Sequence, residues 1–190
     1  MCMKKTLAFS IALLLAMPVI KGQKSMIDLG DKVISVGLGI GNTLYIGGSG
    51  YSTMVPPISV SFEQAVVDDI FDKGVLGLIG SFGYTSYKFR YNMDNQDWGW
   101  NYHNIILGAG SLLHYPLIDR LDTYLGVMLG YNFTTTAEYG DTGDNIPESV
   151  GGFVYAGFIG GRYYFTDQFA AFAQLGYGIA YLTLGVSIRL

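Results

Sequence analysis

The side chains that could do chemistry are a few charged residues set into segments that otherwise alternate apolar and small residues. Glu63, Arg162 and Arg189 stand among Gly, Ser, Thr, Gln and Asn on the polar face of such segments, and Gln174 lies somewhat deeper along another. An isolated charge away from water is costly unless it is paired. We therefore predict that Glu63 meets one or both arginines in a structural polar network that includes Gln174. The alternative use of these groups is a path for protons or a solute.

The two histidines are the next candidates. A hydrolase needs a nucleophile with a histidine and an acid within hydrogen-bond reach. His103 and His114 lie near opposite ends of one alternating segment. His103 could meet a loop Ser or Asp, but no spacing selects a partner. We therefore predict no catalytic residues and no enzyme activity.

The acidic stretch EYGDTGDNIPE at 138–148 could offer carboxylate oxygens to Ca²⁺. It does not match the calcium-loop pattern D-x-[DN]-x-[DN]-G. A solvated acidic loop is therefore the favoured interpretation, and neither a metal nor a cofactor is predicted.

The composition of the chain points to strands with few charges. Charged residues make up 14% of the 190 residues, against roughly 25% in soluble domains. Fifteen Tyr, 11 Phe and 27 Gly accompany a single Cys, which excludes an internal disulfide.

The N-terminus has the features of a secretory signal. Lys4 and Lys5 precede an apolar run from Thr6 to Val19, which is shorter than the ~20 residues of a spanning helix. We expect residues 1–22 to be a cleaved signal peptide and residues 23–190 to form one domain. Cleavage leaves 8 of the 11 basic residues against 15 acidic ones, a balance that argues against a nucleic-acid partner.

After a short polar lead-in at 23–31, apolar residues recur at every second position in eight segments. Period-2 alternation is typical of strands with one apolar face. The predicted strands are 33–40, 57–63, 75–88, 100–115, 124–133, 153–164, 170–177 and 181–190.

The connections between these segments alternate in length. Long polar loops are expected at 41–55, 90–99 and 134–151, and shorter turns follow the second, fourth and sixth strands. Outer-membrane barrels have this arrangement. A helix bundle is excluded because no segment after residue 22 has ~18 consecutive apolar residues.

The strands carry almost no charge on either face, whereas a water-facing surface normally carries many charges. Aromatic residues gather near the strand ends, as they do at membrane borders. We therefore predict an all-β, transmembrane, antiparallel up-and-down β-barrel of eight strands. Its last strand would pair with its first, and its lumen would be filled by side chains.

Three segments resemble the small eight-stranded outer-membrane β-barrel family, especially Bacteroidetes-type members. They are PPISVSFEQ (56–64), FIGGRYYFTDQFAAFAQLGYG (158–178) and LTLGVSIRL (182–190). The resemblance implies a Gram-negative outer-membrane location and a last strand that the barrel-assembly machinery reads. Leu190 stands where the family usually has an aromatic residue.

The expected function is that of an integral outer-membrane protein without catalytic activity, acting as an envelope component or a surface-interaction scaffold. A narrow passive channel is the first alternative, and a lipid-modifying enzyme is the second. The expected partners are outer-membrane lipid and lipopolysaccharide, with the assembly machinery during insertion. A monomer is expected.

Overall fold

The computed structural model describes residues 25–41, 43–44, 50–93, 96–140 and 151–190, with side chains described outside 91–97. The predicted signal peptide at 1–22 and most of the acidic 138–148 stretch lie outside the described residues. No helix of the described chain is long and apolar enough to cross a membrane.

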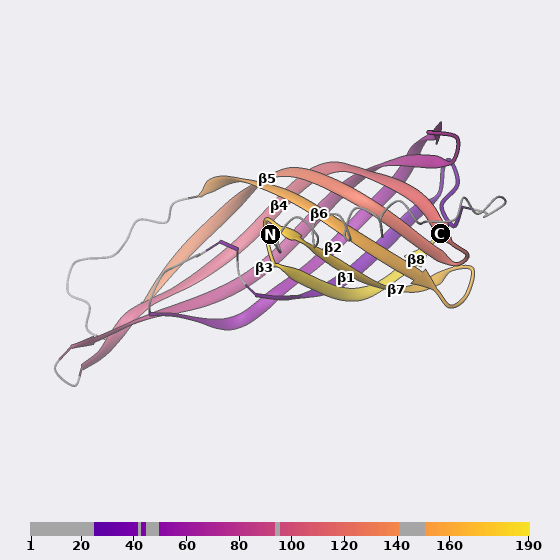
Figure 1. The fold of residues 1–190 in the computed structure, drawn as a ribbon. Helices are drawn as coiled ribbons and strands as arrows, with labels where there is room; N and C mark the ends of the chain where they lie inside the picture. The colour runs from indigo at the N-terminus through magenta and orange to yellow at the C-terminus, as the bar shows by residue number, and fades with distance from the viewer. Residues whose placement is uncertain (1–24, 42, 45–49, 94–95, 141–150) are drawn as a thin grey trace, which may run out of the picture.

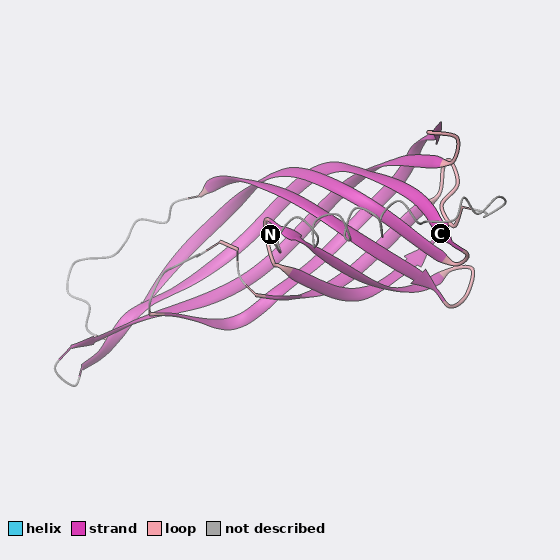
Figure 2. Cartoon of the chain, in the orientation of Figure 1, coloured by secondary structure: helices cyan, strands magenta, loops and turns pink. Residues whose placement is uncertain are grey.

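The chain forms a closed barrel of eight strands, each antiparallel to the next, as the sequence predicts (Figures 1 and 2). The barrel closes because β1 pairs with β8 from Val33–Arg189 to Ile40–Leu182. The strands are β1 Lys32–Ile40, β2 Tyr51–Ile70, β3 Gly74–Met93, β4 Gln96–Ile118, β5 Leu121–Tyr139, β6 Gly152–Tyr164, β7 Phe169–Tyr177 and β8 Leu182–Arg189.

The strands are unequal in length, which corrects the long loops expected at 41–55, 90–99 and 134–151. β3 and β4 have 20 and 23 residues, whereas β7 and β8 have 9 and 8. Residues 51–55, 85–93, 96–104 and 134–139 continue β2 to β5 beyond the rest of the barrel (Figure 1). We call them the protruding sheet. Residues 85–88 and 100–104 were predicted as strand. Polar residues on both faces, such as Thr134 to Thr136, concealed the remaining extensions from a pattern based on alternation.

The opposite end of the barrel carries the tight connections at 71–73, 119–120 and 165–168, and we call it the short-turn end. The turn expected at 66–74 is shorter than predicted because β2 continues to Ile70 through two register shifts.

The outside of the barrel is apolar all the way round. Starting at Val36, the strand register leads through a rung of exposed or half-exposed apolar and aromatic residues: Val60, Phe82, Leu107, Tyr131 and Phe153. Leu129 is 74% exposed and Phe153 is 92% exposed. In water such a continuous surface would be unfavourable.

The inside of the barrel is filled. Leu112, Tyr124, Met128 and Phe158 form a buried cluster, against which Ile79, Ala156 and Ile179 pack. Ile179 comes from the short connection between β7 and β8, which therefore reaches into the barrel. The polar and small face predicted for the strands lines this lumen.

Candidate functional site

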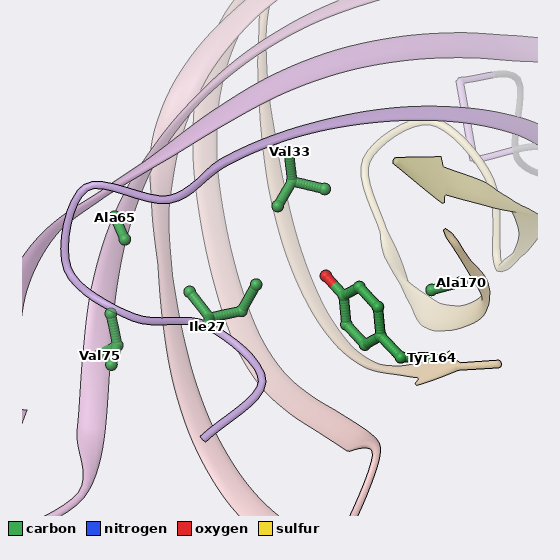
Figure 3. Packing of buried hydrophobic residues seen from close by; sticks show 6 residues of the cluster. All are labelled: Ile27, Val33, Ala65, Val75, Tyr164 and Ala170. Carbon is green, nitrogen blue, oxygen red and sulfur yellow. The ribbon is translucent and has the colours of Figure 1, made fainter. Parts of the chain in front are cut away.

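Residues 25–31 close the short-turn end. Ile27 is only 1% exposed and packs against Val33, Ala65, Val75, Tyr164 and Ala170 (Figure 3). Two backbone hydrogen bonds hold the segment to β2, from Gly30 N to Ala65 O and from Ala65 N to Asp31 O. Gly30 has a φ of 89°, a conformation that glycine adopts without strain. The expected lead-in is thus a plug, which we define as residues 25–31.

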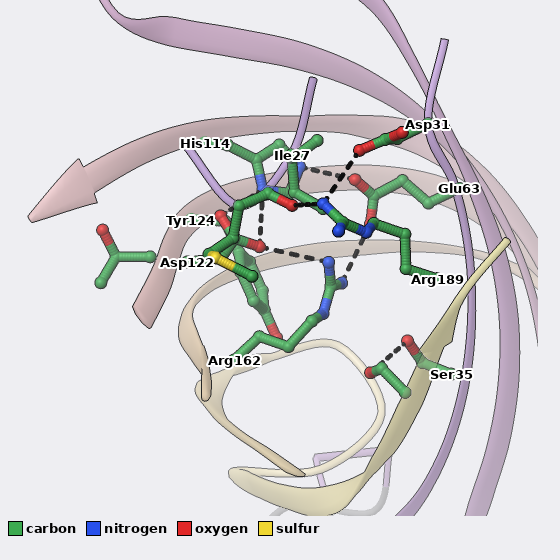
Figure 4. Close-up of polar contacts among 12 residues, drawn as sticks. Ile27, Asp31, Ser35, Glu63, His114, Asp122, Tyr124, Arg162 and Arg189 are labelled. Carbon is green, nitrogen blue, oxygen red and sulfur yellow. Dashed lines mark hydrogen bonds and ion pairs between the residues drawn. The ribbon is translucent and has the colours of Figure 1, made fainter. Parts of the chain in front are cut away.

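Next to the plug, four side chains from four strands form a closed ring of alternating charge (Figure 4). Arg162 Nη2 lies 2.9 Å from Glu63 Oε2, and Arg162 Nη1 lies 3.2 Å from Asp122 Oδ2. His114 Nδ1 lies 2.8 Å from Asp122 Oδ1, and His114 Nε2 lies 2.6 Å from Glu63 Oε1. None of the four is more than 3% exposed. We call them the ion ring.

The geometry fixes the charge of His114. Ionised carboxylates only accept hydrogen bonds, whereas a neutral imidazole has one donor and one acceptor nitrogen. Because both ring nitrogens of His114 face carboxylate oxygens, we infer that the ring is an imidazolium. The contact of Nε2 with Glu63 is an ion pair whose alignment falls short of a hydrogen bond. The ion ring then holds two positive and two negative charges and is neutral as a whole.

A glycine on the intervening strand makes the ion ring possible. Glu63 on β2 reaches His114 on β4 across β3, whose inward residue there is Gly77. A Cβ on Gly77 would lie 3.0 Å from Glu63 Oε1 and 3.2 Å from its Cγ. Any larger residue would therefore push the carboxylate away from the histidine.

The inner side of the ion ring is covered by Tyr124. The Arg162 guanidinium lies 5.2 Å from the centre of the Tyr124 ring, an arrangement that favours a cation–π interaction. Tyr124 Oη donates to Gln174 Oε1 at 3.5 Å. Gly160 gives the tyrosine its place, since a Cβ there would lie 2.4 Å from Tyr124 Cζ.

The structure brings Glu63 and Arg162 together. Gln174 is connected to them through Tyr124, which donates to Gln174 and lies against the Arg162 guanidinium. Arg189 is placed elsewhere. Its Nη1 lies 3.3 Å from Asp31 Oδ2 and donates to the Met26 carbonyl, and its guanidinium lies over the Tyr164 ring at 5.6 Å (Figure 4). Arg189 therefore connects β8 to the plug, and its described partners are plug residues and not Glu63.

Sequence reasoning missed two members of the ion ring, Asp122 and the role of His114. A signal was present for both. His114 stands on the predicted polar face of its strand, and Asp122 is two residues before Tyr124 on the inward face of β5. Extending the predicted strand by one inward position would have placed Asp122 inside the barrel, opposite Arg162.

A small cavity of about 70 Å³ lies in the lumen beyond the ion ring. Its walls include hydroxyls of Ser59, Ser61 and Ser81 on one side and the rings of Phe158 and Phe172 on the other. It has room for a few water molecules.

Each of the two histidines has a partner on another strand. His114 is held in the ion ring, and His103 Nδ1 lies 3.0 Å from Tyr84 Oη. Within the described residues, no three side chains of His, Cys, Asp or Glu gather as a metal site.

The protruding sheet carries aromatic rings on one face. Tyr51, Phe89 and Trp100 lie directly opposite one another in the register. They share a face with the fully buried Thr85 and Asn104, because alternate residues of a strand point to the same side. This is the face that continues the lumen wall. The ring contacts are Tyr51–Phe89 at 4.8 Å, Phe89–Trp100 at 5.9 Å, Trp98–Trp100 at 5.4 Å and Tyr51–Tyr102 at 5.9 Å.

Comparison with known proteins defines the class of fold. No protein-family model and no curated protein matches the chain. Among solved structures, the outer membrane protein OprG from Pseudomonas aeruginosa is similar, with a TM-score of 0.60 and 10% identity over 90% of this chain and 99% of that one. Ail, the attachment invasion locus protein of Yersinia pestis, was solved in complex with the heparin analogue sucrose octasulfate. It matches with a TM-score of 0.52 and 16% identity over 86% of this chain and all of that one. The fold is thus that of the small outer-membrane β-barrels.

Proposed function

We propose that this chain is an integral protein of a Gram-negative outer membrane, without catalytic activity, that displays the protruding sheet at the cell surface. The short-turn end then faces the periplasm, since outer-membrane barrels keep their short turns on that side. A Bacteroidetes-type barrel family, which the sequence segments resemble, is the finer assignment that we propose.

The observation that carries this proposal is the inversion of the two faces of the sheet. Exposed apolar side chains encircle the outside, while four charged side chains are buried inside. A soluble barrel would have the opposite arrangement. The fold of OprG and Ail, both outer-membrane or attachment proteins by description, supports the same location.

The filled lumen favours a scaffold over a passive channel. A solute on the barrel axis would meet the apolar cluster around Phe158, then the ion ring, then Ile27 of the plug. The cavity beside the apolar cluster is about 70 Å³, far less than the water-filled lumen of larger porins. The aromatic face of the protruding sheet is the surface that we propose for contact with a partner or a glycan.

Two measurements test this proposal. Cell fractionation should place the protein in the outer membrane, with faster gel migration before heating than after, as expected of a folded barrel. A soluble protein with heat-independent migration would overturn the barrel assignment in the membrane. Refolded protein in planar bilayers should give no steady single-channel conductance, whereas steady conductance would favour the channel.

A third measurement addresses enzyme activity. Lipid A from cells with and without the protein should have the same acyl pattern by mass spectrometry. A changed acyl pattern would overturn the non-catalytic assignment and favour a lipid-modifying enzyme.

A further inference from the structure

The outward face of β3 and β4 changes chemistry along its length. Leu78 and Phe82 on β3 and Leu107 and Ile105 on β4 are exposed and apolar. Tyr84 and His103 follow and are hydrogen-bonded to each other at 3.0 Å. Further along β3, Lys88 and Arg90 lie on the same face, four and six residues beyond Tyr84. The β3–β4 register has no shift from Val75 to Met93, so these residues stay on one face.

The position of these two cations is distinctive within the described chain. Of the other described lysines and arginines, Lys32, Lys73, Arg120 and Arg189 lie at the short-turn end, and Arg162 lies in the interior. Lys88 and Arg90 are therefore the basic side chains of the described outer half, and both belong to a surface that faces away from the lumen.

The Lys88 ammonium has a fixed place. It lies 3.7 Å from the centre of the Tyr139 ring, a contact that leaves its positive charge intact. Arg90 is exposed. A guanidinium binds phosphate through paired N–H groups, and an ammonium binds it as a point charge.

The height of Lys88 is close to that of a lipid headgroup. Lys88 is four residues beyond Tyr84, which at ~3.3 Å per residue and a tilt of ~45° places its backbone roughly 9 Å above that of Tyr84. The same estimate places the backbone of Arg90 roughly 14 Å above it. The headgroup layer of one leaflet is about 5–8 Å thick, and a lysine side chain can reach down into it. Tyr84 can donate to His103 Nδ1, and the Nε2–H of His103 is then a donor for another acceptor.

We propose that Lys88 and Arg90, with His103 below them, bind the phosphate groups of a phosphorylated glycolipid in the outer leaflet. Charge complementarity selects this occupant, because the face is apolar below and cationic at headgroup height. The site lies on the opposite face of the protruding sheet from the aromatic rings. The inference rests on the proposed membrane location, which cell fractionation tests separately.

The test uses the refolded protein in detergent micelles, titrated with diphosphorylated lipid A and with lipid A whose phosphates have been removed. The double variant Lys88→Gln/Arg90→Gln should bind the phosphorylated form at least roughly tenfold more weakly. The reason is that each basic residue near an anionic surface strengthens binding severalfold. The matched control Lys73→Gln/Arg120→Gln removes the same charge at the short-turn end and should bind like the wild type. Heat-dependent gel migration confirms that each variant is folded.

Three results would overturn the proposal: equal binding of both lipid forms by the wild type, an equal loss in the two double variants, or displacement of lipid A by millimolar inorganic phosphate. The last result would assign the cations to free phosphate. The lipid site is supported if the wild type prefers the phosphorylated form and only the Lys88/Arg90 variant loses this preference. This result does not depend on whether the protein conducts ions or solutes.

Discussion

Arg162 Nη2 lies 2.9 Å from Glu63 Oε2 although the two residues are 99 positions apart in the chain. The same guanidinium reaches Asp122 with Nη1, and His114 completes the circle. Each member of the ion ring thus depends on two others from different strands, so the ring reports whether β2, β4, β5 and β6 are in register.

Replacing Glu63 by Gln should destabilise the barrel by about 3–5 kcal/mol, because it leaves two buried cations with one buried carboxylate. Urea unfolding of the refolded protein in micelles, followed by heat-dependent gel migration, measures the change. Asp28→Asn, at an exposed carboxylate of the plug, is the control and should change little. An unfolding midpoint for Glu63→Gln equal to that of the wild type would show that the ion ring is not structural.

Combining Glu63→Gln with Arg162→Met should cost less than the two single changes added together, because the double variant keeps the His114–Asp122 pair and has no excess buried charge. Coupling energies of about 0.5–3 kcal/mol are usual for residues in one network. A double-mutant cycle of unfolding free energies measures it. Simple additivity would mean that the two side chains do not interact in the folded protein.

Replacing Ile27 by Ala should lower the free energy of unfolding by about 2–5 kcal/mol, as expected for a fully buried aliphatic side chain. Leu29→Ala, at a 55% exposed residue of the same segment, should have a small effect. If both substitutions are neutral in micelles, the plug does not stabilise the barrel.

Gly160→Ala should destabilise the barrel by about 1–3 kcal/mol, since the added methyl group overlaps the Tyr124 ring. Gly157→Ala on the same strand adds the same methyl group where nothing lies within 4 Å, so it should be neutral. Comparable urea midpoints for the two variants would contradict the placement of Tyr124.

Leu129→Arg should reduce membrane stability by about 2–4 kcal/mol, the cost of a charged residue at the middle of the lipid-facing surface. Ala137→Arg lies on the same face of β5, in the protruding sheet, and should be tolerated. Refolding yield into lipid vesicles measures both. Equal yields for the two variants would argue that the exposed apolar surface around Leu129 does not face lipid.

The number of strands, the closed barrel and the inward or outward face of the strand residues could be predicted from sequence, because apolar residues recur at every second position along the strands. Where both faces meet water, as at Thr134 to Thr136, this alternation disappears and the strand looks like a loop. Residues 51–55, 89–93, 96–99 and 134–139 of the protruding sheet were missed for this reason, whereas 85–88 and 100–104 were predicted as strand. The strands of the protruding sheet pair through backbone hydrogen bonds that continue the register of the barrel. Backbone hydrogen bonds do not require particular residue types, so the sequence gives little sign of them.

Glu63 and Arg162 could be selected from sequence because a charge in an apolar strand stands out. Asp122 was missed because it follows a turn, where an aspartate is ordinary, and only its position two residues before Tyr124 pointed to the inward face. Ile27 was also missed: one apolar residue in a polar lead-in gives no sign that the segment folds back against Tyr164. Both depend on contacts between distant parts of the chain.

The unequal strand lengths make the two sides of the barrel different. The strands β2 to β5 extend as a wall on one side, while β1 and β6 to β8 end sooner on the other. In the proposed orientation, this wall stands on one side of the barrel at the cell surface. An approaching macromolecule would therefore meet different surfaces depending on the direction from which it diffuses. In a crowded membrane, a neighbouring protein would likewise meet a different surface on each side of the barrel. Contacts between neighbours could therefore favour one rotation of the barrel about its own axis over others.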